Sequence, residues 1–262
     1  MTLPSSEALA TAGLRLDIAD SVATITLSKP ERKNSQTPRM WHMLAAIGAG
    51  LGDDVRVVVL KGEGPCFSAG LDVALISPDG LEGEDSVFEL MQADDQTVID
   101  TIGGYQDGFT WLADDRFISI AQVHSHAIGA GFQLALACDL RVVADDVQFC
   151  MKEPALGLVP DLTGTKPLVD IVGYPRALEI CATARRVGAR EAVEIGLATA
   201  AVPTEELHAT VRDLAAALTA HPAGAVQETK ALLKQAAGND LEAQRLAERT
   251  AQVRRFRELT GR

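Results

Sequence analysis

The sequence is poor in aromatic residues, paired cysteines and long apolar runs. Aromatic side chains make up 4% of the 262 residues, so the core must be largely aliphatic. No cysteine lies in a Cys-x-x-Cys pair and no histidine stands at metal-ligand spacing, which predicts no metal site. We expect reduced thiols that pack as small apolar groups at Cys66, Cys138, Cys150 and Cys181.

The chain also lacks a targeting or membrane-spanning pattern and an excess of positive charge. No run reaches the length of a transmembrane helix, and no basic segment precedes an apolar one near Met1, which predicts a cytoplasmic protein. The formal net charge of −12 repels nucleic-acid phosphates and anionic membranes, so we expect neither as a partner. An anionic small ligand would need basic side chains close to its site.

What the chain does contain is a regular alternation of strand and helix patterns. Alternating apolar residues over 14–27, broken at Asp20-Ser21, predict a β-hairpin. Nearly continuous apolar runs predict strands buried on both faces, with helices between them. These predicted elements are a helix over 39–51, a strand over 55–60, a strand over 118–123, a helix over 129–138, and strands over 140–144 and 147–149. The pattern indicates the α/β class with parallel pairing.

The last sixty residues read differently from the rest. Helical patterns cover 205–220, 223–237 and 241–259, so we expect a core over 1–200 and a C-terminal helical region over 201–262. Residues 73–112 are acidic and irregular. They predict either a lid made of a loop and a helix or a solvated surface insertion.

Two glycine-containing turns follow buried strands and are the first indication of function. Residues 68–72 (SAGLD) come after the strand at 55–60, and residues 129–131 (GAG) open the helix after 118–123. A helix N-terminus has unpaired N–H groups and a positive dipole end, and small residues let a ligand oxygen approach them. Two such N–H groups that converge on one oxygen form an oxyanion hole.

Several motifs occur in one order along nearly the whole chain. They are ITLSKPERKN (25–34), FSAGLD (67–72), IGAGFQLALACD (128–139), GLVP (157–160), GT (164–165), AREA (189–192) and GL (196–197). In this order they resemble the enoyl-CoA hydratase/isomerase, or crotonase, superfamily. The resemblance implies a spiral of ββα units, C-terminal helices used for trimerisation, and an acyl-CoA thioester substrate bound by a homotrimer or hexamer.

The resemblance also implies site residues. The oxyanion donors are the backbone N–H groups of Leu71 and Ala130. Arg32 and Lys33 resemble the basic contacts to the nucleotide part of CoA, and Lys230 and Phe256 are weaker candidates for that role. The other residues expected at the substrate are Ser68, Ala69, Gly70, Asp72, Gly129 and Pro160. Coenzyme A enters as part of the substrate, so no separate cofactor is expected.

Carboxylates at three family positions decide which proton chemistry is available. The first, a glutamate in typical hydratases, is Gln133 here; it cannot accept a proton but can hydrogen-bond a water or the substrate. The second is Glu153, which we expect on a loop because Pro154 follows it. We expect Glu153 to be a buried catalytic base with a raised pKa. The alternative is a solvated or structural glutamate, paired for example with Lys152.

The third position is Asp161. It matches a catalytic aspartate of the dienoyl-CoA isomerases and aroyl-CoA dehalogenases of the family. The alternative is a helix N-cap or an Asx-turn before residues 163–165. His124 and His126, which flank the second glycine turn, are expected to be structural.

These residues favour one reaction over its rivals. A double-bond shift needs one carboxylate to move a proton, whereas hydration holds a water between two, so we predict an isomerase before a hydratase. Dehalogenation ranks last because it would require an aromatic-lined pocket, and the chain has few aromatic residues. The alternative from another class is a catalytically reduced acyl-CoA carrier or regulatory protein, which Gln133 keeps open.

Overall fold

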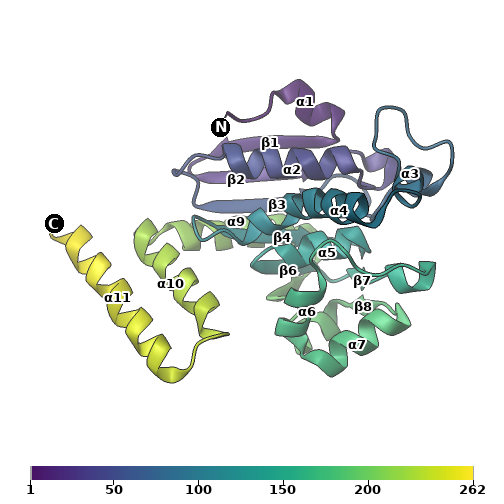
Figure 1. Cartoon of the computed structure of the whole chain (residues 1–262). Coiled ribbons are helices and arrows are strands. Elements are labelled where there is room, and N and C mark those ends of the chain that lie inside the picture. Colours follow the sequence, from purple (N-terminus) through teal and green to yellow (C-terminus); the bar gives the residue numbers. More distant parts are fainter. Residues whose placement is uncertain (1, 262) are drawn as a thin grey trace.

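A six-stranded sheet forms the centre of the molecule in the computed structural model, which describes residues 2–261 (Figure 1). Its order is β1-β2-β3-β4-β6-β9. The first pair is antiparallel and every later pair is parallel, as predicted. The strands are β1 (Leu14–Ala19), β2 (Val22–Leu27), β3 (Val57–Gly62), β4 (Ile118–Val123), β6 (Leu140–Ala144) and β9 (Ala200–Val202).

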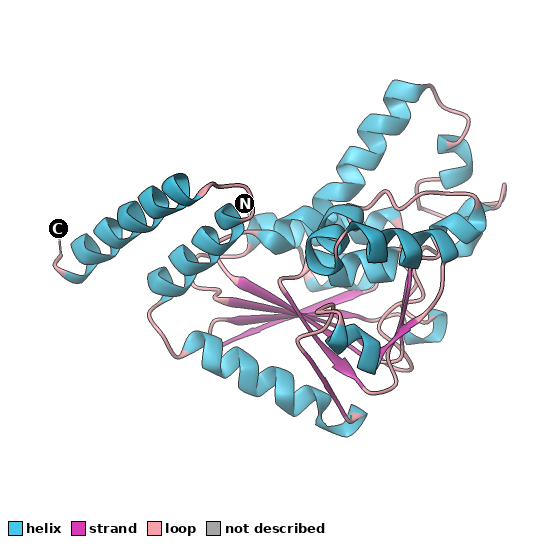
Figure 2. Ribbon diagram, turned by 90° about the horizontal axis from the view of Figure 1, so that it is seen from below, coloured by secondary structure: helices cyan, strands magenta, loops and turns pink. Residues whose placement is uncertain are grey.

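Side chains of the central strands point alternately to two apolar layers. On one side, α2 (Pro38–Gly50) and α4 (Asp95–Thr110) cover the sheet. On the other, α9 (Leu207–Thr219) packs against Val57, Val59, Ile120 and Val142. Figure 2 shows helices on both sides of the strands. This double cover explains the uninterrupted apolar runs in the sequence.

A second, three-stranded sheet adjoins the first. It has the order β5-β7-β8, with β5 (His126–Ile128), β7 (Gln148–Cys150) and β8 (Val187–Gly188). The helices around it are α5 (Ala130–Ala137), α6 (Thr165–Val172), α7 (Tyr174–Thr183) and α8 (Ala189–Glu194). Strands β5, β8 and β9 were not predicted from the sequence, because two or three residues show no usable periodicity. The helices α6, α7 and α8, of 8, 10 and 6 residues, were not predicted either.

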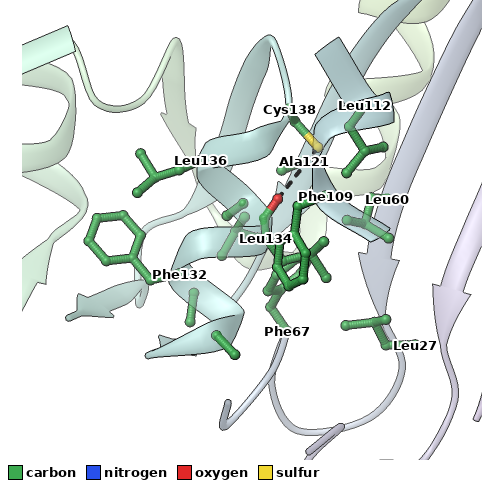
Figure 3. Close-up of a cluster of buried hydrophobic side chains, with 14 of the residues drawn as sticks. Leu27, Leu60, Phe67, Phe109, Leu112, Ala121, Phe132, Leu134, Leu136 and Cys138 are labelled. Carbon is green, nitrogen blue, oxygen red and sulfur yellow. Dashed lines mark hydrogen bonds between the residues drawn. The ribbon is translucent and has the colours of Figure 1, made fainter. Parts of the chain in front are cut away.

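The scarce aromatic residues concentrate in the core that holds α5 in place. Figure 3 shows Phe67, Phe109 and Phe132 among Leu60 of β3 and Leu134 of α5. All five are fully buried. The start of α5 is thereby fixed next to the carboxyl ends of β3 and β4, which are parallel neighbours.

The irregular segment expected over 73–112 divides into two parts. It contains the short helices η2 (Val73–Ile76) and α3 (Val87–Leu90), and then α4, which packs on α2. The acidic loop before α3 is tied to α2 mainly through Arg39: its amide donates to Glu84 Oε2, and its guanidinium donates to Gly83 O. The first part is thus a loop with two short helices, while α4 belongs to the body.

Two C-terminal helices, α10 (Ala223–Ala236) and α11 (Leu241–Leu259), project from the body as a pair (Figure 1). The boundary expected at residue 200 lies inside the packed core, because β9 pairs with β6 and α9 covers the sheet. The core thus continues through Thr219. The N-terminal helix α1 (Ser6–Thr11) was not anticipated. None of the helices within residues 2–261 has the length and apolar character to cross a bilayer.

A buried ion pair fastens α10 to the body. Lys230 Nζ donates to Asp139 Oδ2 at 2.7 Å and to the carbonyl oxygens of Asp114 and Phe117. Its side chain is 5% exposed. Lys230 is therefore not free to bind a CoA phosphate, which corrects the weaker expectation for this residue. Phe256 lies on the projecting α11 and is 59% exposed.

Replacement of Lys230 should weaken the attachment of α10. Lys230→Met leaves the Asp139 carboxylate and two carbonyls without their donor, which should lower the free energy of unfolding by about 3–5 kcal/mol. Lys234→Met is the matched control, since its 47%-exposed side chain makes a surface pair with Asp115 worth under about 1 kcal/mol. Urea unfolding measures both, and equal losses for the two variants would contradict the anchoring role of Lys230.

Candidate functional site

The first glycine turn, residues 68–72, is held on both sides by backbone hydrogen bonds. The amide of Ser68 donates to His126 O at 2.9 Å, and the amide of Ile128 donates to Ser68 O at 3.1 Å. On the other side, the amide of Gln36 donates to Gly70 O and the amide of Asp72 donates to Gln36 O. The turn is therefore held between β5 and the backbone at Gln36.

The side chain of Ser68 acts inside this turn rather than at its surface. It is fully buried, donates to Asn34 O at 2.8 Å and accepts from Gln36 Nε2 and from the amide of Gly70. Ser68 was expected among the substrate contacts, and the structure gives it a supporting place behind them.

The two glycine turns are in direct contact. Gly70 has a φ of +87°, and a Cβ added to it would lie 2.4 Å from Ile128 O and 3.5 Å from the amide nitrogen of Ala130. A Cβ on Gly131 would lie 2.8 Å from Ser68 Cβ. Only glycine permits this approach of two backbones. The sequence prediction that the two turns lie together is thus met by the geometry.

Two amide groups at this junction are free. Within residues 2–261, neither the Leu71 amide nor the Ala130 amide donates a hydrogen bond to the protein. Ala130 is the first residue of α5, and Gly129 before it, at φ 51° and ψ −120°, provides no side-chain cap. Both N–H groups are therefore available to an anionic oxygen, and the positive end of the α5 dipole favours one.

Glu153 lies beside the second turn. A Cβ added at Gly129 would lie 3.2 Å from Glu153 Oε1, so the missing side chain makes room for this carboxylate. Glu153 was expected on a loop, but it begins the 3-10 helix η4 (Glu153–Leu156). Pro154 is compatible with the first turn of a helix, where its missing N–H costs nothing.

The two oxygens of Glu153 have different surroundings. Oε1 accepts a hydrogen bond from Gln133 Nε2 at 2.7 Å, whereas the buried Oε2 has no partner within residues 2–261. Burial raises the pKa of Glu153, and the negative charge of Asp161 adds to the rise. Since no ion pair with Lys152 forms in the described chain, the solvated or ion-paired alternative is wrong.

Gln133 is fully buried and engaged with the protein. Besides its bond to Glu153, its Oε1 accepts from the amides of Leu162 at 2.9 Å and Gly164 at 3.2 Å. The expectation that Gln133 hydrogen-bonds a water or the substrate does not match this arrangement, because its oxygen and one amide hydrogen already have protein partners.

Asp161 lies on the loop between η4 and α6. Its carboxylate accepts no hydrogen bond from the rest of residues 2–261, and α6 begins after Gly164 without a side-chain cap. The N-cap and Asx-turn alternatives are therefore wrong. Burial raises the pKa of Asp161. Its carbonyl accepts from Gln106 Nε2 on α4 at 2.7 Å, and Pro160 precedes it on the same loop.

The basic loop expected at the nucleotide part of CoA adjoins the first turn. Arg32 Nη2 lies 2.7 Å from Asp72 Oδ2 and its side chain is 47% exposed, while Asp72 is buried. Although burial alone raises the pKa of Asp72, hydrogen bonds from Ser35 and Arg32 outweigh it and lower the pKa. Lys33 is exposed, and its carbonyl accepts from the amide of Ala69.

Sequence reasoning missed three supporting polar side chains. Gln36 clamps the first turn, and its Oε1 accepts from Trp41 Nε1 at 2.8 Å. Asn34 Nδ2 donates to the carbonyls of Glu63 and Cys66. Gln106 holds the Asp161 loop. Their spacing gives no signal, because each side chain reaches a group far away in sequence: Gln36 reaches Ser68, Asn34 reaches Glu63 and Cys66, and Gln106 reaches Asp161. Only Asn34 stood in a noted motif.

The histidines and cysteines have the structural character that was expected. His124 Nε2 lies 2.9 Å from Gly64 O, and His126 Nδ1 lies 2.6 Å from Ser125 Oγ. All four thiols are free, and those of Cys66, Cys138 and Cys150 are buried.

Comparison with known proteins places this geometry in a family. The model of the family described as enoyl-CoA hydratase/isomerase matches residues 17–260. A Rhodobacter capsulatus protein named as a probable enoyl-CoA hydratase is 31% identical over 231 residues, covering 88% of this chain and 84% of that protein. The peroxisomal Δ(3,5)-Δ(2,4)-dienoyl-CoA isomerase of Arabidopsis thaliana is 33% identical over 181 residues, covering 69% and 64%.

Solved structures agree with the sequence relatives. A candidate enoyl-CoA hydratase of Thermobifida fusca, in complex with CoA, superposes with a TM-score of 0.95 at 50% identity and covers 100% of this chain and 99% of its own. A second Thermobifida fusca structure, in complex with acetoacetyl-CoA, superposes with a TM-score of 0.95 at 51% identity and covers 98% of this chain and 100% of its own. The chain has the crotonase fold and belongs to the enoyl-CoA hydratase/isomerase family.

Proposed function

We propose that this protein is an enoyl-CoA isomerase that shifts a double bond along the acyl chain of a CoA thioester. The observation that carries the proposal is the Glu153 carboxylate, with one oxygen held by Gln133 and the other free, beside the free amide of Ala130. The CoA and acetoacetyl-CoA complexes of the Thermobifida fusca neighbours support a thioester ligand.

The proposed reaction moves one proton and needs no other reagent. The Leu71 and Ala130 N–H groups hold the thioester oxygen, while Glu153 removes a proton from the α-carbon of a 3-enoyl-CoA. The bonding electrons move into a dienolate whose oxygen charge the two donors stabilise. The protonated Glu153 then returns the proton to the γ-carbon, which yields a 2-enoyl-CoA. No electrons leave the substrate, so the scheme requires no redox cofactor.

Hydration of a 2-enoyl-CoA is the second candidate, and Asp161 is the observation that favours it. Its carboxylate is close enough to raise the pKa of Glu153, so two acidic groups face one site. Relatives named as hydratases point the same way. Against it, Gln133 occupies one of the two positions that would hold the water, and a neutral amide cannot accept its proton.

The remaining proposed contacts concern CoA and assembly. Arg32 and Lys33 offer positive charge beside the first turn, suited to the CoA phosphates. The projecting helices carry exposed apolar residues: Leu233, Leu241, Leu246, Val253, Phe256 and Leu259. Apolar surface of this extent on a pair of helices favours burial against further copies, as homotrimer or hexamer.

Removal of the base should abolish turnover. Glu153→Gln should lower kcat on 3-enoyl-CoA by on the order of 10²–10⁴-fold, with product followed by chromatography. In the wild type, kcat/KM should rise with pH through a midpoint above the usual glutamate value of 4.5, because burial raises the Glu153 pKa and the base must be ionised. Tight thioester binding without turnover of any 2- or 3-enoyl-CoA would instead support the carrier alternative.

Separation of the two turns should damage the oxyanion hole. Gly70→Ala places a Cβ 2.4 Å from Ile128 O, and the displaced amides should cost on the order of 10²–10³-fold in kcat. Gly196→Ala is the matched control: its φ is +76°, but no atom lies within 4 Å of the added Cβ. Steady-state kinetics compare them, and equal kcat values for the two variants would refute the role of the turn.

The assembly proposal predicts a mass above that of one chain. Sedimentation velocity at micromolar concentration should give a trimer or hexamer of the 27.8 kDa chain. The double variant Leu246→Glu, Phe256→Glu should shift the distribution toward smaller species, because charge replaces apolar contact on α11. A monomeric wild type would exclude this assembly.

A further inference from the structure

We propose that Gln133 is a positioning residue that sets which oxygen of Glu153 faces the substrate and how far the Asp161 loop lies from it. This inference deepens the proposed function and rests on Glu153 as the base. On this proposal Gln133 acts through Glu153. Its position in the sequence had suggested direct contact with a water or the substrate instead.

Three hydrogen bonds make Gln133 a bridge between the two acidic groups. Its Nε2 donates to Glu153 Oε1 at 2.7 Å, and its Oε1 accepts from the amides of Leu162 and Gly164. The side chain is fully buried on the short helix α5. One amide group therefore ties the helix that starts at the free Ala130 N–H to both carboxylate-bearing segments.

Packing reinforces these bonds. A Cβ added to Gly164 would lie 2.7 Å from Gln133 Cγ and 3.1 Å from its Cβ, so the loop backbone rests directly on the glutamine side chain. The Asp161 loop can approach Glu153 no closer than this stack allows. On its far side, Gln106 of α4 holds the carbonyl of Asp161.

The bond to Gln133 also selects the reactive oxygen. Because Oε1 is occupied, the unpartnered Oε2 is the atom left to accept a substrate proton. An amide donor stabilises the ionised carboxylate and so opposes the rise in pKa caused by burial. The other titratable groups facing Glu153 are Asp161, Cys150 of β7 and Cys181 of α7.

The substitution Gln133→Glu tests this role while keeping the side-chain shape. The new carboxylate still accepts from Leu162 and Gly164, but it meets Glu153 as a second acid at hydrogen-bond distance. The two acids then share one proton, so the acidic limb of the kcat/KM profile should move to higher pH. At the original optimum kcat should fall on the order of 10–100-fold with little change in KM.

Gln227→Glu is the matched control. Gln227 Nε2 donates at 2.7 Å as well, but to the backbone carbonyl of Arg116 and in a region remote from Glu153. The same exchange of amide for acid there should leave the pH profile in place. An unchanged pH profile for both variants would overturn the proposal. A gain of hydratase activity in Gln133→Glu without a shift of the acidic limb of the profile would also overturn it, because residue 133 would then act on the substrate directly.

A second readout does not depend on turnover. In protein labelled with ¹³C at the glutamate carboxyls, the resonance lost in Glu153→Gln identifies Glu153, and its titration should move to higher pH in Gln133→Glu. Gln133→Met, which removes the donor without adding charge, should shift it the same way if the first variant does not fold. A Glu153 titration that stays in place refutes the positioning role. Absence of wild-type turnover refutes only the proposed function.

Discussion

The close approach of two backbones at Gly70 is the constraint on which the rest of the site depends. Parallel strands β3 and β4 bring two following turns to one edge of the sheet, but a side chain at Gly70 would hold them apart. Their contact leaves the Leu71 and Ala130 amides unpaired at the start of α5. Unpaired donors next to a helix N-terminus favour an anionic oxygen.

The acid at this site is governed by burial and by its neighbours. Gly129 immediately precedes α5 and makes room for the Glu153 carboxylate, so this carboxylate lies beside the turn that carries the free Ala130 amide. Burial and the charge of Asp161 raise the pKa of Glu153, while the Gln133 amide works in the opposite direction. A base that is neither exposed nor paired with a cation is suited to taking a proton from carbon and giving it back.

The periphery depends on long-range polar anchors. Asp139, two residues past the end of α5, accepts from Lys230 and from Ser119, so the segment that follows α5 also fastens α10. Beyond this anchor, α10 and α11 expose apolar surface, whereas α9 packs its apolar face against the sheet. The boundary between core and projecting region is therefore set by packing at Thr219 and not by the change to helical sequence near residue 200.

The sequence alone determined the α/β class, the strands over 118–123 and 140–144, the glycine turns and the acidic residue types at Glu153 and Asp161. These are visible because periodicity and glycine reflect local backbone requirements. Only the tertiary structure decided that Gln133 holds Glu153, that Lys230 is buried on Asp139, and that α9 belongs to the core. Each of these is a contact between residues far apart in the chain, and which atoms meet depends on how whole elements pack.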